Sequence, residues 1–265
     1  MQQNKQRMAP VACVARSTLY YHSKQLVKDW HTKQLIEEAL QMHPSYGHKR
    51  LALHLHLNKK RILRVMKIYS IKPYKRTVKK RFVTKTKDSI VPNLLIHKTP
   101  MGPGDIYASD FTYIKWKGIW VYVGTVLDVY TREVIGVAVQ TTHGAQLVMN
   151  TLLSALHAKP PPRIIHSDQG SEYASSDYTT LLHTVGIIQS MSHPGCPWEN
   201  GYQESFYKGF KVELGDPNRF ETLGELVAEI YLTLHYYNTK RIHSALSMAP
   251  RQFAAQDRSV VYLRS

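Results

Sequence analysis

The chain has 265 residues, 43% of them hydrophobic, so it can hold one large domain with a true core plus a smaller one. No apolar run approaches the roughly 18 residues of a membrane helix, and the first residues lack the apolar stretch of a signal peptide, so we expect a cytoplasmic protein. The net charge is +16, and the two cysteines, Cys13 and Cys196, are too few for a disulfide framework or a zinc site.

The basic charge is concentrated in the first part of the chain. Residues 1–104 contain 22 lysines and arginines against 4 acidic residues, whereas residues 105–265 contain 13 against 15. A surface that only needed to be soluble would mix both signs. The asymmetry therefore predicts that the first part binds a polyanion, and nucleic acid is favoured over a membrane because no amphipathic anchor accompanies the charge.

Short helices are predicted in residues 1–71. Apolar residues at helical spacing indicate helices over 29–43, 46–57 and 59–70, with Asn58 as a cap of the third, and a further short helix after Ser17. Short helices with a basic outer face are typical of a helix-turn-helix DNA-binding region. The candidate base-reading residues are Lys49, Arg50, Arg61 and Arg64.

Residues 72–104 are rich in lysine, interrupted by proline and glycine, and lack sustained periodicity. We interpret this segment as a basic linker that follows the DNA backbone, with Lys79, Lys80 and Arg81 as contacts. The alternative is a merely solvated tether.

Residues 105–265 alternate between strand and helix patterns. Strands are expected over 106–115, 119–130 and 133–141, with Lys117-Gly118 as the first turn and residues 130–132 as the second connection. Helices at 144–158 and 175–186 alternate with short strands at 161–168 and 187–191, and helices at 198–213 and 221–238 follow. The order β-β-β-α-β-α-β-α predicts a ribonuclease-H-like mixed sheet with helices on both sides.

Three carboxylates stand where this fold would bring them together. Asp110 lies inside a strand pattern, Asp168 follows a short apolar strand, and Glu204 lies on the helix that begins near Trp198, with 57 and 35 residues between them. Three clustered carboxylates repel one another unless cations neutralise them, and oxygen ligands favour Mg²⁺ or Mn²⁺ over zinc. Two such ions would support phosphoryl transfer on a phosphodiester.

Several residues near these carboxylates allow both a functional and a structural interpretation. Asn200 and Lys211 fall on the Glu204 face at helical spacing, so both are DNA-contact candidates, although a solvated or ion-paired lysine is the simpler reading of Lys211. His166 either lines the site or is a hydrogen-bonded structural histidine. Asp128 is a rival to Asp110, and we interpret it as a strand-end cap or a partner of Arg132. Spacing by itself leaves other carboxylate trios open.

Five segments in order resemble the OrfB product of transposases in the insertion sequence three family. They are SYGHKRLALHL, SDFTYI, HSDQGSEY, PGCPWENGYQESFYKGFKVE and YNTKRIHSAL. The resemblance implies an integrase-type core with Asp110, Asp168 and Glu204 as catalytic and metal-binding residues, followed by the basic Lys211. It also implies Mg²⁺-dependent cleavage and strand transfer at terminal inverted repeats, and an OrfA partner or frameshift fusion that assembles with it as an oligomer on DNA.

Two positions depart from the family pattern. Glu199-Asn200-Gly201 stands where the family usually has Asp-Asn-Ala, and Gly209 lies within the helix of Glu204. A glycine inside a helix costs about 1 kcal/mol relative to alanine, so we expect some loss of local rigidity. The competing functions are a non-catalytic DNA-binding regulator that acts without OrfA, and a structure-specific nuclease of the same fold.

Overall fold

The computed structural model describes residues 13, 24–74, 91–96, 99–193 and 196–262, without the side chains of 197, 198 and 257–262. The predicted helix after Ser17 and the basic residues Lys79, Lys80 and Arg81 lie outside the described residues. Among the described helices, none is long and apolar enough to cross a membrane.

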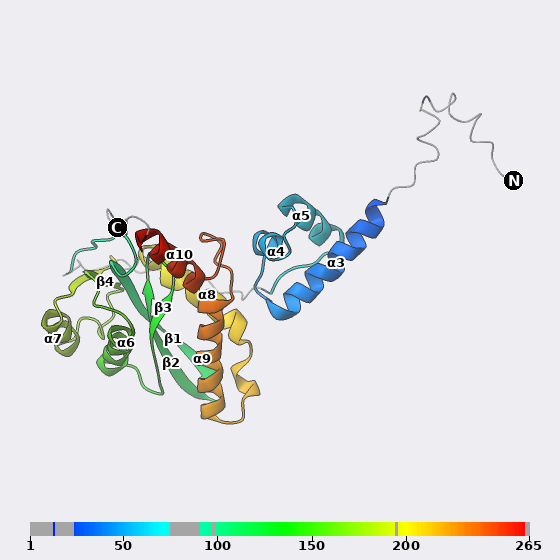
Figure 1. The fold of residues 1–265 in the computed structure, drawn as a ribbon. Coiled ribbons are helices and arrows are strands. Elements are labelled where there is room, and N and C mark those ends of the chain that lie inside the picture. The colour runs from blue at the N-terminus through cyan, green and yellow to red at the C-terminus, as the bar shows by residue number, and fades with distance from the viewer. Residues whose placement is uncertain (1–12, 14–23, 75–90, 97–98, 194–195, 263–265) are drawn as a thin grey trace.

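Three helices form a unit of their own beside the sheet (Figure 1). They are α3 (Gln25–Met42), α4 (His48–His54) and α5 (Lys59–Ile68). The Asn58 side chain accepts a 2.8 Å hydrogen bond from the backbone N–H of Lys60, which confirms it as the cap of α5. The unit has its own buried core, made by Ile36, Ala39, Tyr46, Leu51, Ile62, Val65 and Met66.

A mixed sheet of five strands follows, in the order β3-β2-β1-β4-β5. Its strands are β1 (Ile106–Trp116), β2 (Ile119–Asp128), β3 (Val134–Gln140), β4 (Ile164–Ser167) and β5 (Ile188–Met191). The first three are antiparallel, whereas β4 pairs in parallel with β1 and β5 with β4. Lys117 and Gly118 both have positive φ, 43° and 88°, as the tight turn of a two-residue hairpin requires. The predicted order of the strands along the chain and the first turn are confirmed.

Helices cover both faces of the sheet (Figure 1). On one face α6 (Ala145–Ala158) and α7 (Ser176–Thr184) pack on a core that includes Tyr107, Val126 and Ile165. On the other, α8 (Gly201–Leu214) and α9 (Leu223–Thr239) pack on a core that includes Ile114, Val121 and Val123. Alternate residues of β1 and β2 therefore enter different cores, because neighbours on a strand point to opposite faces.

Two details of the C-terminal part differ from the sequence prediction. The helix expected from Trp198 begins as a 3₁₀ turn, η1 (Pro197–Asn200), and only Gly201 starts α8. A second short 3₁₀ turn, η2 (Pro217–Arg219), separates α8 from α9, and α10 (Pro250–Tyr262) was not predicted. Among the described side chains of α10, only Pro250 and Ala254 are buried to the level of the core.

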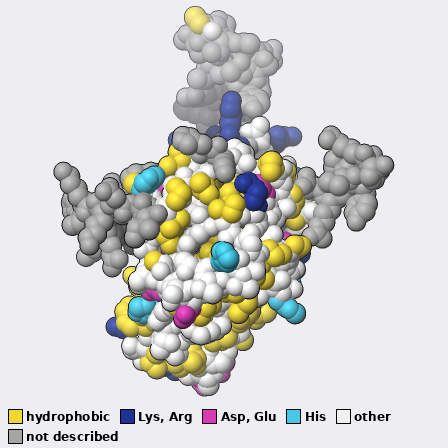
Figure 2. All heavy atoms as spheres, turned by 90° about the vertical axis from the view of Figure 1, so that its left-hand side faces the viewer, with side chains coloured by type: hydrophobic (Ala, Val, Ile, Leu, Met, Phe, Trp, Pro, Cys, Tyr) yellow, Lys and Arg dark blue, Asp and Glu magenta, His cyan; other side chains and the backbone are white. Residues whose placement is uncertain are grey.

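On the side of α7, the described residues of the sheet domain do not form a strongly basic face. Figure 2 views the molecule from that side, and few lysine, arginine or acidic side chains appear there among hydrophobic and uncharged ones. This agrees with the nearly balanced charge of residues 105–265.

Gly209 has a packing role that its place in a helix did not reveal. A Cβ at this position would lie 2.8 Å from Nη2 and 3.3 Å from Cζ of Arg241, whose side chain is buried. Gly209→Ala is therefore expected to destabilise the protein by about 1–2 kcal/mol, because overpacking outweighs the gain in helix propensity. Urea unfolding will measure this change, and a more stable variant would show that Arg241 moves aside at no cost.

Candidate active site

Asp110 and Asp168 lie side by side where β1 continues past the end of β4. The two strands pair in parallel, with Ala108 opposite His166, so Asp110 and Asp168 each stand two residues further along. Residues two apart on a strand share a face. The parallel register thus places both carboxylates at the same edge of the sheet, on the side covered by α8.

Both carboxyl groups have raised pKa values. The pKa of Asp110 is raised to about 8, first by burial and then by the charge of Asp168, while the N–H of Phe111 and the Lys211 cation oppose the rise. The pKa of Asp168 is also raised, first by loss of hydration and then by Glu172, against a 3.0 Å hydrogen bond from the N–H of Gly170. Both shifts disfavour negative charge, which is what a bound cation would relieve.

The first turns of α8 are bound to the backbone of β1 beside Asp110. Gln203 Nε2 donates to the carbonyl oxygen of Ala108 at 2.6 Å, and the Tyr207 hydroxyl donates to the carbonyl oxygen of Asp110 at 2.6 Å. The Tyr207 hydroxyl also lies 2.8 Å from the Thr125 hydroxyl on β2. These buried contacts hold α8 against the strand that carries Asp110, and sequence patterns gave no signal for them.

Glu204 stands between Gln203 and Tyr207 on the exposed side of this turn. Among the described residues, no three Asp, Glu, His or Cys side chains are close enough to hold a metal ion. The structure therefore brings Asp110 and Asp168 together and places Glu204 on the adjacent helix, outside that pair.

The rival carboxylates have structural partners. Asp128 is buried, and its oxygens accept hydrogen bonds from the N–H groups of Gly104, Tyr130 and Thr131 at 2.8, 2.8 and 3.1 Å. This is the role of a strand-end cap, and the pair with an Arg132 side chain is not seen among the described contacts. Glu199 binds the His193 ring at 3.0 Å and the side-chain amide of Asn93 at 2.6 Å.

Of the remaining candidates near the site, only Lys211 comes close to the carboxylates. It acts electrostatically on Asp110, and its Nζ lies 5.2 Å from the ring centroid of Tyr113. His166 is fully buried, with Nδ1 2.9 Å from the Ser190 hydroxyl, and burial lowers its pKa to about 4. Asn200 is 6% exposed and precedes α8, so it does not share the exposed side of Glu204. The structure thus favours the structural reading of His166 and removes Asn200 from the predicted helix face.

The basic candidates of the helical unit fall into two groups. Lys49 is exposed, whereas Arg50 is half-buried, and burial followed by the nearby Arg241 lowers its pKa to about 10. Arg61 donates to the Thr32 hydroxyl at 2.6 Å, and Arg64 binds the buried Asp29 through two nitrogens at 2.6 and 2.8 Å. Arg61 and Arg64 therefore join α5 to α3 in this structure.

Two family models described as Integrase core domain match residues 100–197 and 185–250, together more than half of the chain. A transposase for insertion sequence element IS904 of Lactococcus lactis is 39% identical over 168 residues, covering 61% of this chain and 66% of that protein. Transposase InsF for insertion sequence IS3A of Escherichia coli is 34% identical over 156 residues, covering 57% and 54%. The chain belongs to the IS3 family of transposases. The resemblance to that family is thereby confirmed.

The fold of this IS3-family chain also has solved counterparts. A simian T-cell lymphotropic virus intasome in complex with PP2A regulatory subunit B56 gamma matches 79% of this chain and 70% of that chain, at a TM-score of 0.52 and 16% identity. The ribonuclease-H-like mixed sheet flanked by helices is therefore confirmed. The matches span less than two thirds of the length of either transposase above.

Proposed function

We propose that this IS3-family chain cuts and joins DNA at the ends of an insertion sequence, as a metal-dependent polynucleotidyl transferase. The observation that carries the proposal is the pair Asp110 and Asp168, held side by side at one sheet edge with raised pKa values. Neighbouring carboxyl groups with raised pKa values at a strand end are typical of a site that binds cations. The membership of the IS3 family supports the same chemistry.

The donor set fits hard divalent cations. Asp110 and Asp168 offer only oxygen, and Glu204 on the adjacent helix would supply a further carboxylate after its exposed side chain turns toward them. We propose these three residues as ligands of two Mg²⁺ ions, for which Mn²⁺ can substitute. When bound, such ions lower the pKa of an attacking water or hydroxyl and stabilise the leaving oxygen.

The residues of the chain position the substrate for an in-line displacement. The oxygen of a water or a 3′-hydroxyl forms a bond to phosphorus and gives its proton to solvent, while the bond to the leaving oxygen breaks and that oxygen takes up a proton from solvent. Lys211, whose charge acts at Asp110, is placed to bind a non-bridging phosphate oxygen. Gln203 and Tyr207 keep α8 at a fixed distance from β1 through their hydrogen bonds to its backbone.

The other parts of the chain complete the proposal. Residues 1–71 would act as a DNA-binding region, 72–104 as a basic linker and 105–265 as the catalytic core, acting on DNA in the bacterial cytoplasm. Exposed Lys49 is the base-contact candidate that we retain first. Terminal inverted repeats and target DNA are the proposed substrates, and an OrfA partner or fusion and an oligomeric assembly are the proposed context.

The test uses the purified chain with labelled DNA that carries the inverted repeats flanking its gene. We expect nicked or joined products with Mg²⁺ or Mn²⁺, and none with EDTA or with Ca²⁺ in place of Mg²⁺. The assay is run with and without the product of any upstream overlapping reading frame. DNA binding without any product under all these conditions would instead support the regulator.

A further inference from the structure

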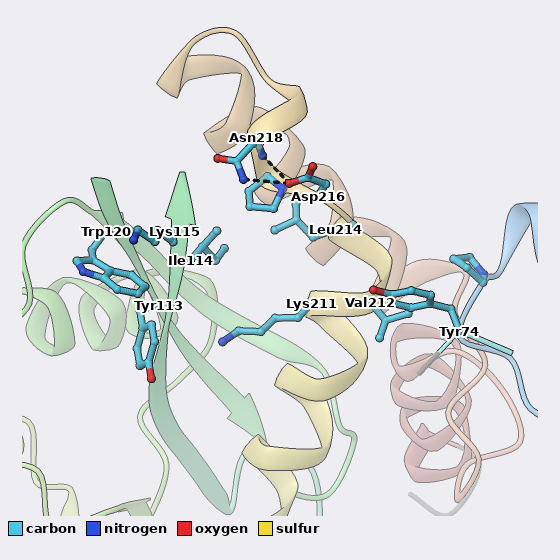
Figure 3. A pocket seen from close by; sticks show the side chains of 13 residues that line it. Tyr74, Tyr113, Ile114, Lys115, Trp120, Lys211, Val212, Leu214, Asp216 and Asn218 are labelled. Atoms are coloured by element: carbon cyan, nitrogen blue, oxygen red, sulfur yellow. Dashed lines mark hydrogen bonds between the residues drawn. The ribbon is translucent and has the colours of Figure 1, made fainter. Parts of the chain in front are cut away.

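A groove of about 750 Å³ lies along the edge of β1 (Figure 3). We call it the edge groove and define it by Tyr113, Lys115, Trp120 and Lys211, over a floor of Ile114, Val212 and Leu214. Its far wall is made by η2 and by Pro44 and Tyr74 of the N-terminal unit. This volume is in the range of sites that bind a ligand of several rings.

The topology of the sheet opens this groove. In the described part of the chain, β4 pairs with β1 only at Ile106–Ala108, so the rest of that edge of β1 has no strand beside it. Lys211 extends from α8 toward Tyr113, as Figure 3 shows. The same lysine acts electrostatically on Asp110. The groove therefore shares Lys211 with the surroundings of Asp110 and runs along β1 toward the β1–β2 turn.

Two aromatic rings are displayed there at right angles. Tyr113 and Trp120 are 45% and 43% exposed, and their ring centroids are 5.2 Å apart with an interplanar angle of 90°. They come from adjacent strands, because Trp120 pairs with Lys115, which stands two residues from Tyr113 on the same face of β1. The hairpin thus fixes two flat apolar surfaces at the surface of the protein, although neither is needed to fill a core.

Each ring is accompanied by a cation. Lys211 Nζ lies 5.2 Å from the centroid of Tyr113, and Lys115 Nζ lies 5.6 Å from that of Trp120. Asp216 also lines the groove. Its carboxylate accepts hydrogen bonds from the N–H and the side-chain amide of Asn218 at 3.0 and 3.1 Å. Flat aromatic rings interleaved with cations are the combination that binds single-stranded nucleic acid, through base stacking and phosphate contacts.

We propose that the edge groove binds unpaired bases of the DNA strand next to the phosphodiester that is cut. Tyr113 and Trp120 stack on the bases, while Lys115 and Lys211 bind flanking phosphates. Bases inside a duplex have both faces covered by their neighbours, so only an unpaired base presents a face to these rings. This inference rests on the proposed function for the identity of the ligand, and it adds a strand-end subsite to it.

The test compares two oligonucleotides of equal sequence in metal-free buffer, so that binding is measured without cleavage. One is a blunt duplex and the other carries a single-stranded 3′ overhang with 2-aminopurine in the overhang. We expect Tyr113→Leu and Trp120→Leu, which keep apolar volume but remove the flat ring, each to weaken binding of the overhang DNA about tenfold. Binding of the blunt duplex should change less than about twofold. The 2-aminopurine fluorescence change on binding should shrink in both variants.

Tyr231→Leu is the matched control, since Tyr231 is 46% exposed on α9 and does not line the edge groove. Wild-type affinity for the overhang in both groove variants, an equal loss for blunt and overhang DNA, or no DNA binding by the chain at all would overturn the inference. A chain that cleaves with Mg²⁺ but fails this test keeps the proposed function and loses the subsite. A chain that discriminates the overhang through these rings but never cleaves keeps the subsite and loses the catalytic proposal.

Discussion

Asp110→Asn is expected to reduce strand cleavage about a thousandfold or more while DNA binding persists. The amide keeps the size of the carboxylate but removes the charge that would hold a metal ion next to Asp168. Asp168→Asn and Glu204→Gln should behave alike if the three act as one site. Labelled-DNA cleavage and fluorescence anisotropy measure the two properties separately, and cleavage retained by any one variant would remove that residue from the proposed metal site.

Asp110→Asn, which removes activity, is expected to increase the stability of the metal-free protein. An unfolded aspartate loses its proton near pH 4, whereas folded Asp110 keeps it up to about pH 8. Below about pH 4 this carboxyl group is protonated in both the folded and the unfolded state, so it adds no pH dependence to the free energy of unfolding. As the pH rises from there toward 8, the unfolded state alone has lost the proton, so the free energy of unfolding falls. Metal-free Asp110→Asn should therefore be more stable than wild type at pH 8, by about 1–2 kcal/mol after allowance for solvent screening.

Magnesium gives the internal check of that prediction. Mg²⁺ should raise the Tm of wild type, because an ion that binds only the folded state stabilises it, and should raise the Tm of Asp110→Asn much less. Asp177→Asn, at an exposed acid in the first turn of α7, is the control for a general charge effect. Equal Mg²⁺ responses in wild type and Asp110→Asn would contradict a metal site at Asp110.

Arg241→Met is expected to lower the free energy of unfolding by about 3 kcal/mol. Arg241 and Glu213 side chains are each 6% exposed, and Nε lies 3.2 Å from Oε1. Arg241 also donates to the Ser45 hydroxyl at 3.2 Å, and that hydroxyl donates to Glu213. Removing the guanidinium leaves a buried carboxylate without its main cation, a loss of about 3–5 kcal/mol. Arg50 also acts electrostatically on the Glu213 carboxylate, so we expect a loss at the lower end of this range.

Urea unfolding checks this value. Arg241→Met combined with Glu213→Gln should recover much of the loss, because no buried charge is then left alone. Arg219→Met is the matched control: Arg219 and Glu229 form an exposed pair at 3.2 Å, and its loss should cost about 0–1 kcal/mol. A loss at Arg241 no larger than at Arg219 would show that the buried pair contributes little.

This pair also links two parts of the chain. Ser45 precedes α4 in the helical unit, Glu213 lies on α8, and Arg241 follows α9. The Tyr46 hydroxyl accepts a 2.8 Å hydrogen bond from the N–H of Ile242, and the His43 and Tyr236 rings stack nearby at 5.7 Å. The junction therefore joins the N-terminal unit to the end of the helix that carries Glu204.

The sequence by itself predicted the fold through local signals. The alternation of β-branched and aromatic residues, the Lys117-Gly118 turn and the helical periodicity are properties of neighbouring residues, and each strand from β1 to β5 was found in the predicted order. The family segments pointed to Asp110, Asp168 and Glu204 without any geometry. α10 was not predicted, and the η1 turn was missed because helix periodicity does not distinguish a 3₁₀ start from an α-helix.

Only the tertiary structure decided which of these residues meet. The parallel register of β1 and β4 brings Asp110 beside Asp168 across 57 intervening residues, and three backbone N–H groups show Asp128 to be a cap. The clash of a Cβ at Gly209 with Arg241 and the right-angled pair of Tyr113 and Trp120 were equally invisible in the chain order. The physical reason is that burial, charge and close approach depend on contacts between segments far apart in sequence, whereas periodicity and turn chemistry act over a few residues.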